Sequence, residues 1–101
     1  MVELKALQEE VYHNKLAKGF NVTDICQEFC HAHAELSEAF DAYIRKRGSV
    51  GEELADVAIY LLGLAQILDI DLETEILAKI RRNEQRTYEM RRGVLTRVDE
   101  E

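Results

Sequence analysis

The stretch ELSEAFDAYIRKRGSVGEELADV, residues 35–57, carries two pairs of acids, and the two acids of each pair lie three residues apart. Glu35 and Glu38 form the first pair, and Glu53 and Asp56 form the second. A basic, glycine-containing segment at 45–49 separates them. Because residues three apart share a helix face, the stretch predicts two successive helices, each presenting two carboxylates.

Apolar residues at helical spacing extend this pattern to the rest of the chain. They predict helices over residues 2–18, from a cap at Asn21 or Thr23 to about 45 or 46, from 50 to about 68, and from 72 to about 91 or 92. Short connections favour antiparallel neighbours. We therefore expect an all-α, compact four-helix bundle-like domain.

Three local signals set the expected helix ends. Gly19 and Gly93 stand where glycine commonly ends a helix. Ser49 and Glu52 fit a capping box that opens the third helix. The tail from about residue 94 is then expected to be loose.

The chain has 101 residues, which suits one domain over 1–101. A core of this size covers a limited share of the chain's surface, so we expect a homo-oligomer, either a dimer or a tetramer. The net charge of −7 argues against specific nucleic-acid binding. The charge is uneven, because residues 79–97 hold seven Lys or Arg against Glu84 and Glu89.

The sequence shows neither a secretory signal pattern nor an apolar run long enough to span a bilayer, so we expect a cytoplasmic protein without membrane association. Cys26 and Cys30 lie four apart on a predicted helix, where a disulfide has poor geometry, and are expected to be reduced. The run CQEFCHAH, residues 26–33, lacks the second ligand pair of a zinc knuckle.

The second acid pair lies on an apolar face. Helical spacing puts Glu53, Asp56 and Tyr60 on one stripe with Gly63 and Ile67. Carboxylates gathered between helices repel one another, and burial adds to the cost. A hard cation with oxygen ligands, Mg²⁺ or alternatively Mn²⁺, would offset both effects.

Other interpretations of the acids stay open. Glu35 and Glu38 taken alone are more often a solvated face, and Glu53 and Asp56 could pair with Lys79 or Arg86 in a structural network. A di-iron bundle normally repeats Glu-x-x-His on two helices, whereas this chain has that motif once, at 28–31.

The residues resemble the MazG-like, all-α nucleoside triphosphate pyrophosphohydrolases. That family shows E-E-x-x-E, a spacer, E-x-x-D within a phrase like EELADV, and often K-x-x-x-N-x-x-R. This sequence has AELSE at 34–38, EELADV at 52–57, and Lys79, Asn83 and Arg86. The resemblance covers about residues 20–88 as a single module, with Ala34 where the family has its first Glu.

The resemblance implies Mg²⁺-dependent hydrolysis of (deoxy)nucleoside triphosphates to a monophosphate and pyrophosphate, in the cleaning of nucleotide pools. The resemblance assigns catalysis and metal binding to Glu35, Glu38, Glu53 and Asp56. By the same resemblance, Lys79, Asn83 and Arg86 contact the substrate. Tyr60 lies one turn after Asp56 on the same helix face and could stack on a base, and His13 in YHNKLAKGF could close over the base. The alternatives are a phosphoribosyl-ATP pyrophosphohydrolase and a non-catalytic helical dimerisation module.

Overall fold

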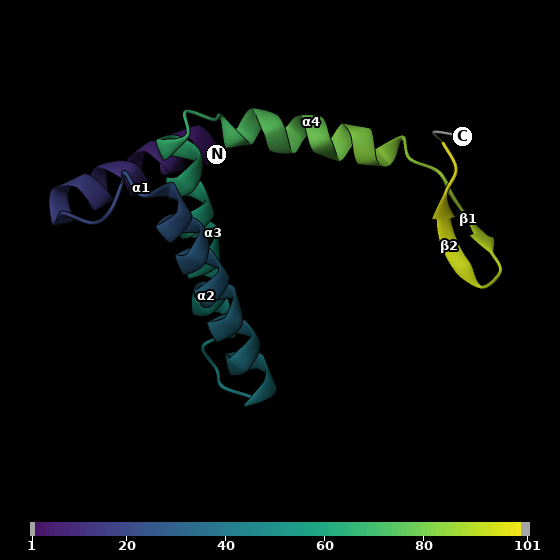
Figure 1. Ribbon diagram of the computed structural model, residues 1–101, viewed down its shortest axis with the longest axis horizontal. Helices are drawn as coiled ribbons and strands as arrows, with labels where there is room; N and C mark the ends of the chain where they lie inside the picture. Colours follow the sequence, from purple (N-terminus) through teal and green to yellow (C-terminus); the bar gives the residue numbers. More distant parts are fainter. Residues whose placement is uncertain (1, 100–101) are drawn as a thin grey trace.

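The computed structural model describes residues 2–99, which form four helices and one small hairpin (Figure 1). The helices are α1 (Leu4–Lys18), α2 (Ile25–Ile44), α3 (Val50–Ile67) and α4 (Leu72–Glu84), and the strands are β1 (Tyr88–Arg91) and β2 (Val94–Arg97). The mostly helical class predicted from the sequence is confirmed.

Helices α2 and α3 form an antiparallel pair, and α1 packs across α3 (Figure 1). Small and branched residues fill this junction: Ala39 and Ala42 from α2, and Leu62, Leu64 and Ala65 from α3, are buried. Gly63 permits the close crossing of α1, because a Cβ atom there would lie 3.3 Å from side-chain carbons of Val11 and Lys15.

The predicted helix ends are partly right. Gly19 ends α1 in the left-handed conformation, with φ of 72°. Asp24 caps α2, in place of the predicted Asn21 or Thr23, and its carboxylate accepts the Gln27 N–H at 3.1 Å. Ser49 precedes α3 but makes no side-chain capping bond, so the predicted capping box does not form.

A buried amide fixes the start of α4 to the body. Gln8 is fully buried, and its Nε2 donates to Gln66 Oε1 at 2.9 Å, while its Oε1 accepts the Leu72 N–H at 3.2 Å. The Leu4 N–H donates to Glu73 Oε1 at 2.8 Å. These bonds join α1, the end of α3 and the first turn of α4.

The prediction for the end of the chain is wrong. Helix α4 ends at Glu84, and residues 88–97 form an antiparallel hairpin where a longer helix and a loose tail were expected. Arg92 and Gly93 both have positive φ, 52° and 78°, as a two-residue type I′ turn requires. Gly93 therefore turns a hairpin and does not end a helix.

A single chain does not form the predicted compact bundle. Over the described residues, α4 packs substantially only against α1 and leads away from α2 and α3 (Figure 1). The radius of gyration is 17.3 Å, whereas a compact chain of this length has about 13 Å. Residues 72–97, α4 and the hairpin, project as an arm.

Candidate functional site

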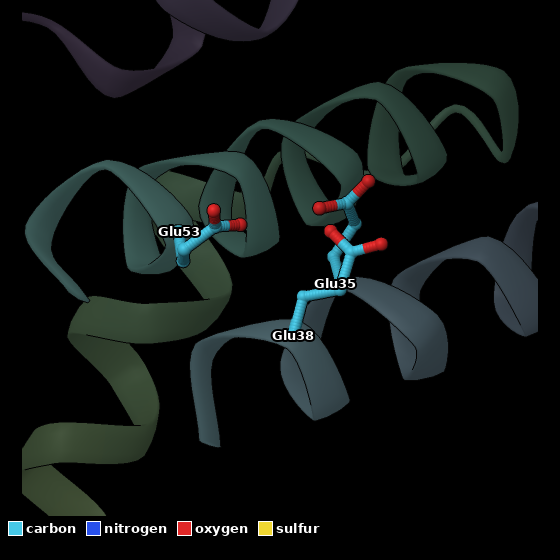
Figure 2. A group of neighbouring side chains, drawn as sticks. All are labelled: Glu35, Glu38 and Glu53. Atoms are coloured by element: carbon cyan, nitrogen blue, oxygen red, sulfur yellow. The ribbon is translucent and has the colours of Figure 1, made fainter. Parts of the chain in front are cut away.

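Three carboxylates from two helices meet on the α2–α3 pair (Figure 2). Glu35 and Glu38 come from the middle of α2, and Glu53 comes from the first turns of α3. One oxygen from each lies within 4.8 Å of the others. We call these three residues the carboxylate cluster. Among residues 2–99, it is the group of acids, cysteines and histidines with the geometry to hold a metal ion.

Glu35 carries the electrostatic strain of the cluster. Its pKa is raised above the ordinary value of 4.5, first by burial and then by the charges of Glu38 and Asp56. Its Oε2 is buried without a hydrogen-bond partner. A carboxylate that is both partly desolvated and surrounded by acids is destabilised in its ionised form.

Asp56, the fourth predicted ligand, is exposed on α3 and lies outside the group of three convergent oxygens. Its charge nevertheless acts on Glu35. The structure thus brings three of the four predicted carboxylates together. The fourth, Asp56, lies close enough for its charge to raise the pKa of Glu35.

A second charged group lies about two helical turns before Glu35 on α2. Glu28 is only 1% exposed and forms an ion pair with Lys15 of α1, which is 8% exposed. His31 Nδ1 lies 3.6 Å from the other Glu28 oxygen. The sequence indicated Glu28 and His31 only as half of a di-iron motif. The pairing of Glu28 with Lys15 depends on the crossing of α1 over Gly63, which no sequence signal shows.

Tyr60 of α3 contacts the group around Glu28 and lies within the electrostatic influence of the carboxylate cluster. The Lys15 Nζ atom lies 4.9 Å from the centroid of its ring, and the His31 ring meets it edge-on at 5.8 Å. The pKa of the phenol is raised by burial, then by the charge of Glu28, with smaller effects of Glu35, Asp56 and Glu38. Tyr60 therefore keeps its proton at neutral pH.

Two cavities border these groups. One of about 420 Å³ opens beside the carboxylate cluster and is lined by Ser37, Glu38, Asp41, Ala42, Arg47 and Glu53. One of about 160 Å³ lies between the α1–α2 loop and Tyr60 and is lined by Phe20, Asn21, Gln27, Glu28, His31 and Tyr60. The lining of the first has three carboxylates and one guanidinium, and the second is bounded by aromatic rings.

The remaining predicted contacts lie elsewhere in the single chain. Lys79 and Asn83 are on α4, and Arg86 follows it with its Nε buried and without a hydrogen bond. His13 is exposed on α1, with its ring edge-on to Tyr12 at 6.2 Å. Their substrate-binding roles stay predictions.

Comparison with protein families, with curated proteins and with solved structures gives no match. Within residues 2–99, no helix is both long and apolar enough to cross a membrane. Cys26 and Cys30 are free and exposed.

Proposed function

We propose that this protein is a Mg²⁺-dependent nucleoside triphosphate pyrophosphohydrolase. The supporting observation is the carboxylate cluster: Glu35, Glu38 and Glu53 converge from two helices at a cost in repulsion that a bound cation would remove. A cytoplasmic enzyme that acts on (deoxy)nucleotides and works as a homo-oligomer accords with the sequence pattern.

The residues fit a hard divalent cation. All convergent donors are carboxylate oxygens, which Mg²⁺ and Mn²⁺ prefer, and the buried Glu35 Oε2 is a donor with no other partner. Glu35, Glu38 and Glu53 would hold the ion, with Asp56 adding negative charge beside it. When bound, the ion would neutralise the triphosphate and polarise the phosphoryl group under attack.

The chain's own groups have separate roles in this proposal. Glu35, whose pKa is raised by burial and by the neighbouring acids, orients and deprotonates the attacking water. Tyr60, held in place by Lys15 and His31, offers a neutral ring and hydroxyl to the nucleoside. The cavity beside Glu38 and Glu53 receives the phosphates.

Pyrophosphate release tests the proposal. A panel of ribo- and deoxynucleoside triphosphates, with phosphoribosyl-ATP included, is assayed with Mg²⁺ and with EDTA. We expect Mg²⁺-dependent release that Glu53→Gln lowers at least about a hundredfold, equivalent to about 2.7 kcal/mol in barrier height. Glu52→Gln is the matched control, because it removes the same charge one residue away and outside the cluster. Equal losses in the two variants would refute the assignment.

Thermal unfolding measures metal binding apart from activity. A cation that binds only the folded state stabilises it by RT ln(1 + [L]/Kd). The parent should gain melting temperature with Mg²⁺, and Glu53→Gln and Asp56→Asn should lose most of that gain while melting no earlier than the parent in EDTA. A parent without any Mg²⁺ shift and without turnover would support the alternative, a non-catalytic helical dimerisation module.

A further inference from the structure

The smaller cavity, of about 160 Å³ between the α1–α2 loop and Tyr60, is separate from the carboxylate cluster. Whole small-molecule ligands occupy cavities of about 300–1,000 Å³, so a cavity of this size suits one part of a larger ligand. The rings of Phe20, His31 and Tyr60 form part of its wall. Aromatic walls with a few polar groups are typical of sites that read the edge of a nucleobase.

Glu28 places a carboxylate with free acceptor capacity in the wall of this cavity. The residue is 1% exposed, and its Oε1 makes no hydrogen bond, although Lys15 forms an ion pair with it. His31 Nδ1 lies 3.6 Å from Oε2, which is too long for a hydrogen bond. A carboxylate offers about four acceptor positions, so both oxygens keep lone pairs for a ligand. Because buried polar side chains are normally hydrogen-bonded, we expect a bound molecule to supply the donors.

The position of the cavity suits the base of a nucleotide whose phosphates lie at the carboxylate cluster. Glu28 precedes Glu35 by seven residues on α2, which is about 10 Å along the helix axis. Tyr60 contacts Lys15 and His31 beside Glu28 and lies within the electrostatic influence of Glu35. The nucleoside can therefore extend past Tyr60 toward Glu28.

The donor pattern of the base decides which nucleotide fits a carboxylate. Guanine presents N1–H and its 2-amino group side by side, and two parallel donors match the two oxygens of one carboxylate. Adenine and cytosine present an amino donor beside a ring nitrogen that accepts, and uracil and thymine present one N–H between two carbonyls. In both cases an acceptor faces the carboxylate. Guanine O6 needs a donor in turn, and the Gln27 amide in the same wall can supply it.

Lys15 makes the carboxylate suitable for a neutral base. An isolated charge as buried as Glu28 is costly, whereas the Lys15 ammonium beside it compensates that charge. Glu28 can then stay ionised, and hydrogen bonds to an ionised acceptor are about twice as strong as neutral ones.

We propose that Glu28 selects guanine nucleotides. Its carboxylate accepts hydrogen bonds from N1–H and the 2-amino group of the base, Gln27 donates to O6, and Tyr60 packs on the ring. The inference rests on the proposed hydrolase function for the position of the phosphates, and it adds the identity of the base. A purely structural Lys15–Glu28 pair would leave the base unrecognised.

The parent protein tests this selection without any substitution. Inosine triphosphate lacks only the 2-amino group of GTP, so it removes one of the two donors to Glu28. We expect the kcat/KM of GTP for pyrophosphate release with Mg²⁺ to exceed that of inosine triphosphate about tenfold or more, and those of ATP, CTP and UTP further. Equal kcat/KM values for GTP and inosine triphosphate would overturn the selection and leave the hydrolase standing.

A double substitution separates recognition from the ion pair. Glu28→Gln alone strands the Lys15 ammonium, so it is combined with Lys15→Met, which removes both charges. In the double variant, the ratio of kcat/KM between GTP and inosine triphosphate should fall to about one. Gln27→Met, at an exposed position, is the control: it should slow both nucleotides alike, because both carry O6. A folded double variant that keeps the parent's ratio would overturn the proposal.

Calorimetric binding of nucleoside monophosphates to the parent covers a protein without turnover. GMP that binds about tenfold more tightly than inosine monophosphate, with no hydrolysis of any triphosphate, would refute the hydrolase and support base selection by Glu28. Equal affinity for the two, or no binding of either in a protein without turnover, would overturn the selection as well.

Discussion

Glu28 and Glu35 are the same residue type, seven positions apart on one helix, yet their surroundings are opposite. Glu28 is buried and ion-paired with Lys15, whereas Glu35 is partly buried among Glu38, Asp56 and Glu53. The chain supplies the ammonium of Lys15 to Glu28, whereas the charges that raise the pKa of Glu35 come from other carboxylates. A compensated buried charge holds helices together, and an uncompensated one is a place where a cation can bind.

Tyr60 lies between these two groups and contacts only the first of them directly. Its ring packs on Lys15 and His31, and the acids on both sides raise its pKa. The Lys15–Glu28 pair can therefore be regarded as the support that holds Tyr60 in place beside the carboxylate cluster.

The largest effect should come from breaking the compensated pair. Glu28→Gln keeps the shape and leaves the Lys15 ammonium buried without its partner, which we expect to cost roughly 3–5 kcal/mol of unfolding free energy. The measurement is urea unfolding at neutral pH in EDTA. Glu35→Gln, the identical substitution on the same helix, is the control and should cost nothing. If both variants lost the same unfolding free energy, the distinction between an ion-paired Glu28 and an unpaired Glu35 would be wrong.

A smaller effect should follow from removing the ring between the two groups. Base–aromatic stacking contributes roughly 1–3 kcal/mol, so Tyr60→Ala should raise the KM of preferred nucleotides about tenfold or more and flatten preferences across the panel. Tyr60→Phe keeps the ring and serves as the control for stacking. The Mg²⁺-induced melting shift should persist in both, since the phenol is not a ligand of a hard cation. Relative rates that stay the same in Tyr60→Ala would exclude a role in selectivity.

The smallest effect should be a pH-dependent gain from Glu35→Gln. Because the folded-state pKa of Glu35 is raised, its contribution to stability is complete below about pH 4.5 and is lost as the pH rises through the raised pKa. Without metal, the variant should thus match the parent in acid and exceed it at neutral pH. Thermal unfolding in EDTA across that range measures the difference. If the stability difference between Glu35→Gln and the parent did not change with pH, the ionised Glu35 would not be destabilised in the folded protein. With added Mg²⁺ at neutral pH, the parent should become the more stable of the two.

The local pattern predicted the helices that carry the site. The acid-x-x-acid spacing and the break at 45–49 predicted Glu35, Glu38 and Glu53 on two adjoining helices. In the structure, one carboxylate oxygen of each lies within 4.8 Å of the others. The pattern failed at the end of the chain, where Gly93 predicts a helix terminus but lies in the turn of a hairpin. The β-branched and aromatic residues on either side of Arg92 and Gly93 were the missed hairpin signal.

The sequence by itself determined what is periodic and local: four helices, the separation of charge along the chain, and the acids on one helix face. Only the tertiary structure decided which charges are compensated. The Lys15–Glu28 pair exists because α1 crosses α3 where Gly63 has no side chain. The ionised form of Glu35 is destabilised first by burial and then by the charges of Glu38, Asp56 and Glu53, the last two of which come from α3. Both depend on how helices cross, and a crossing is set by packing between residues that lie far apart in the chain.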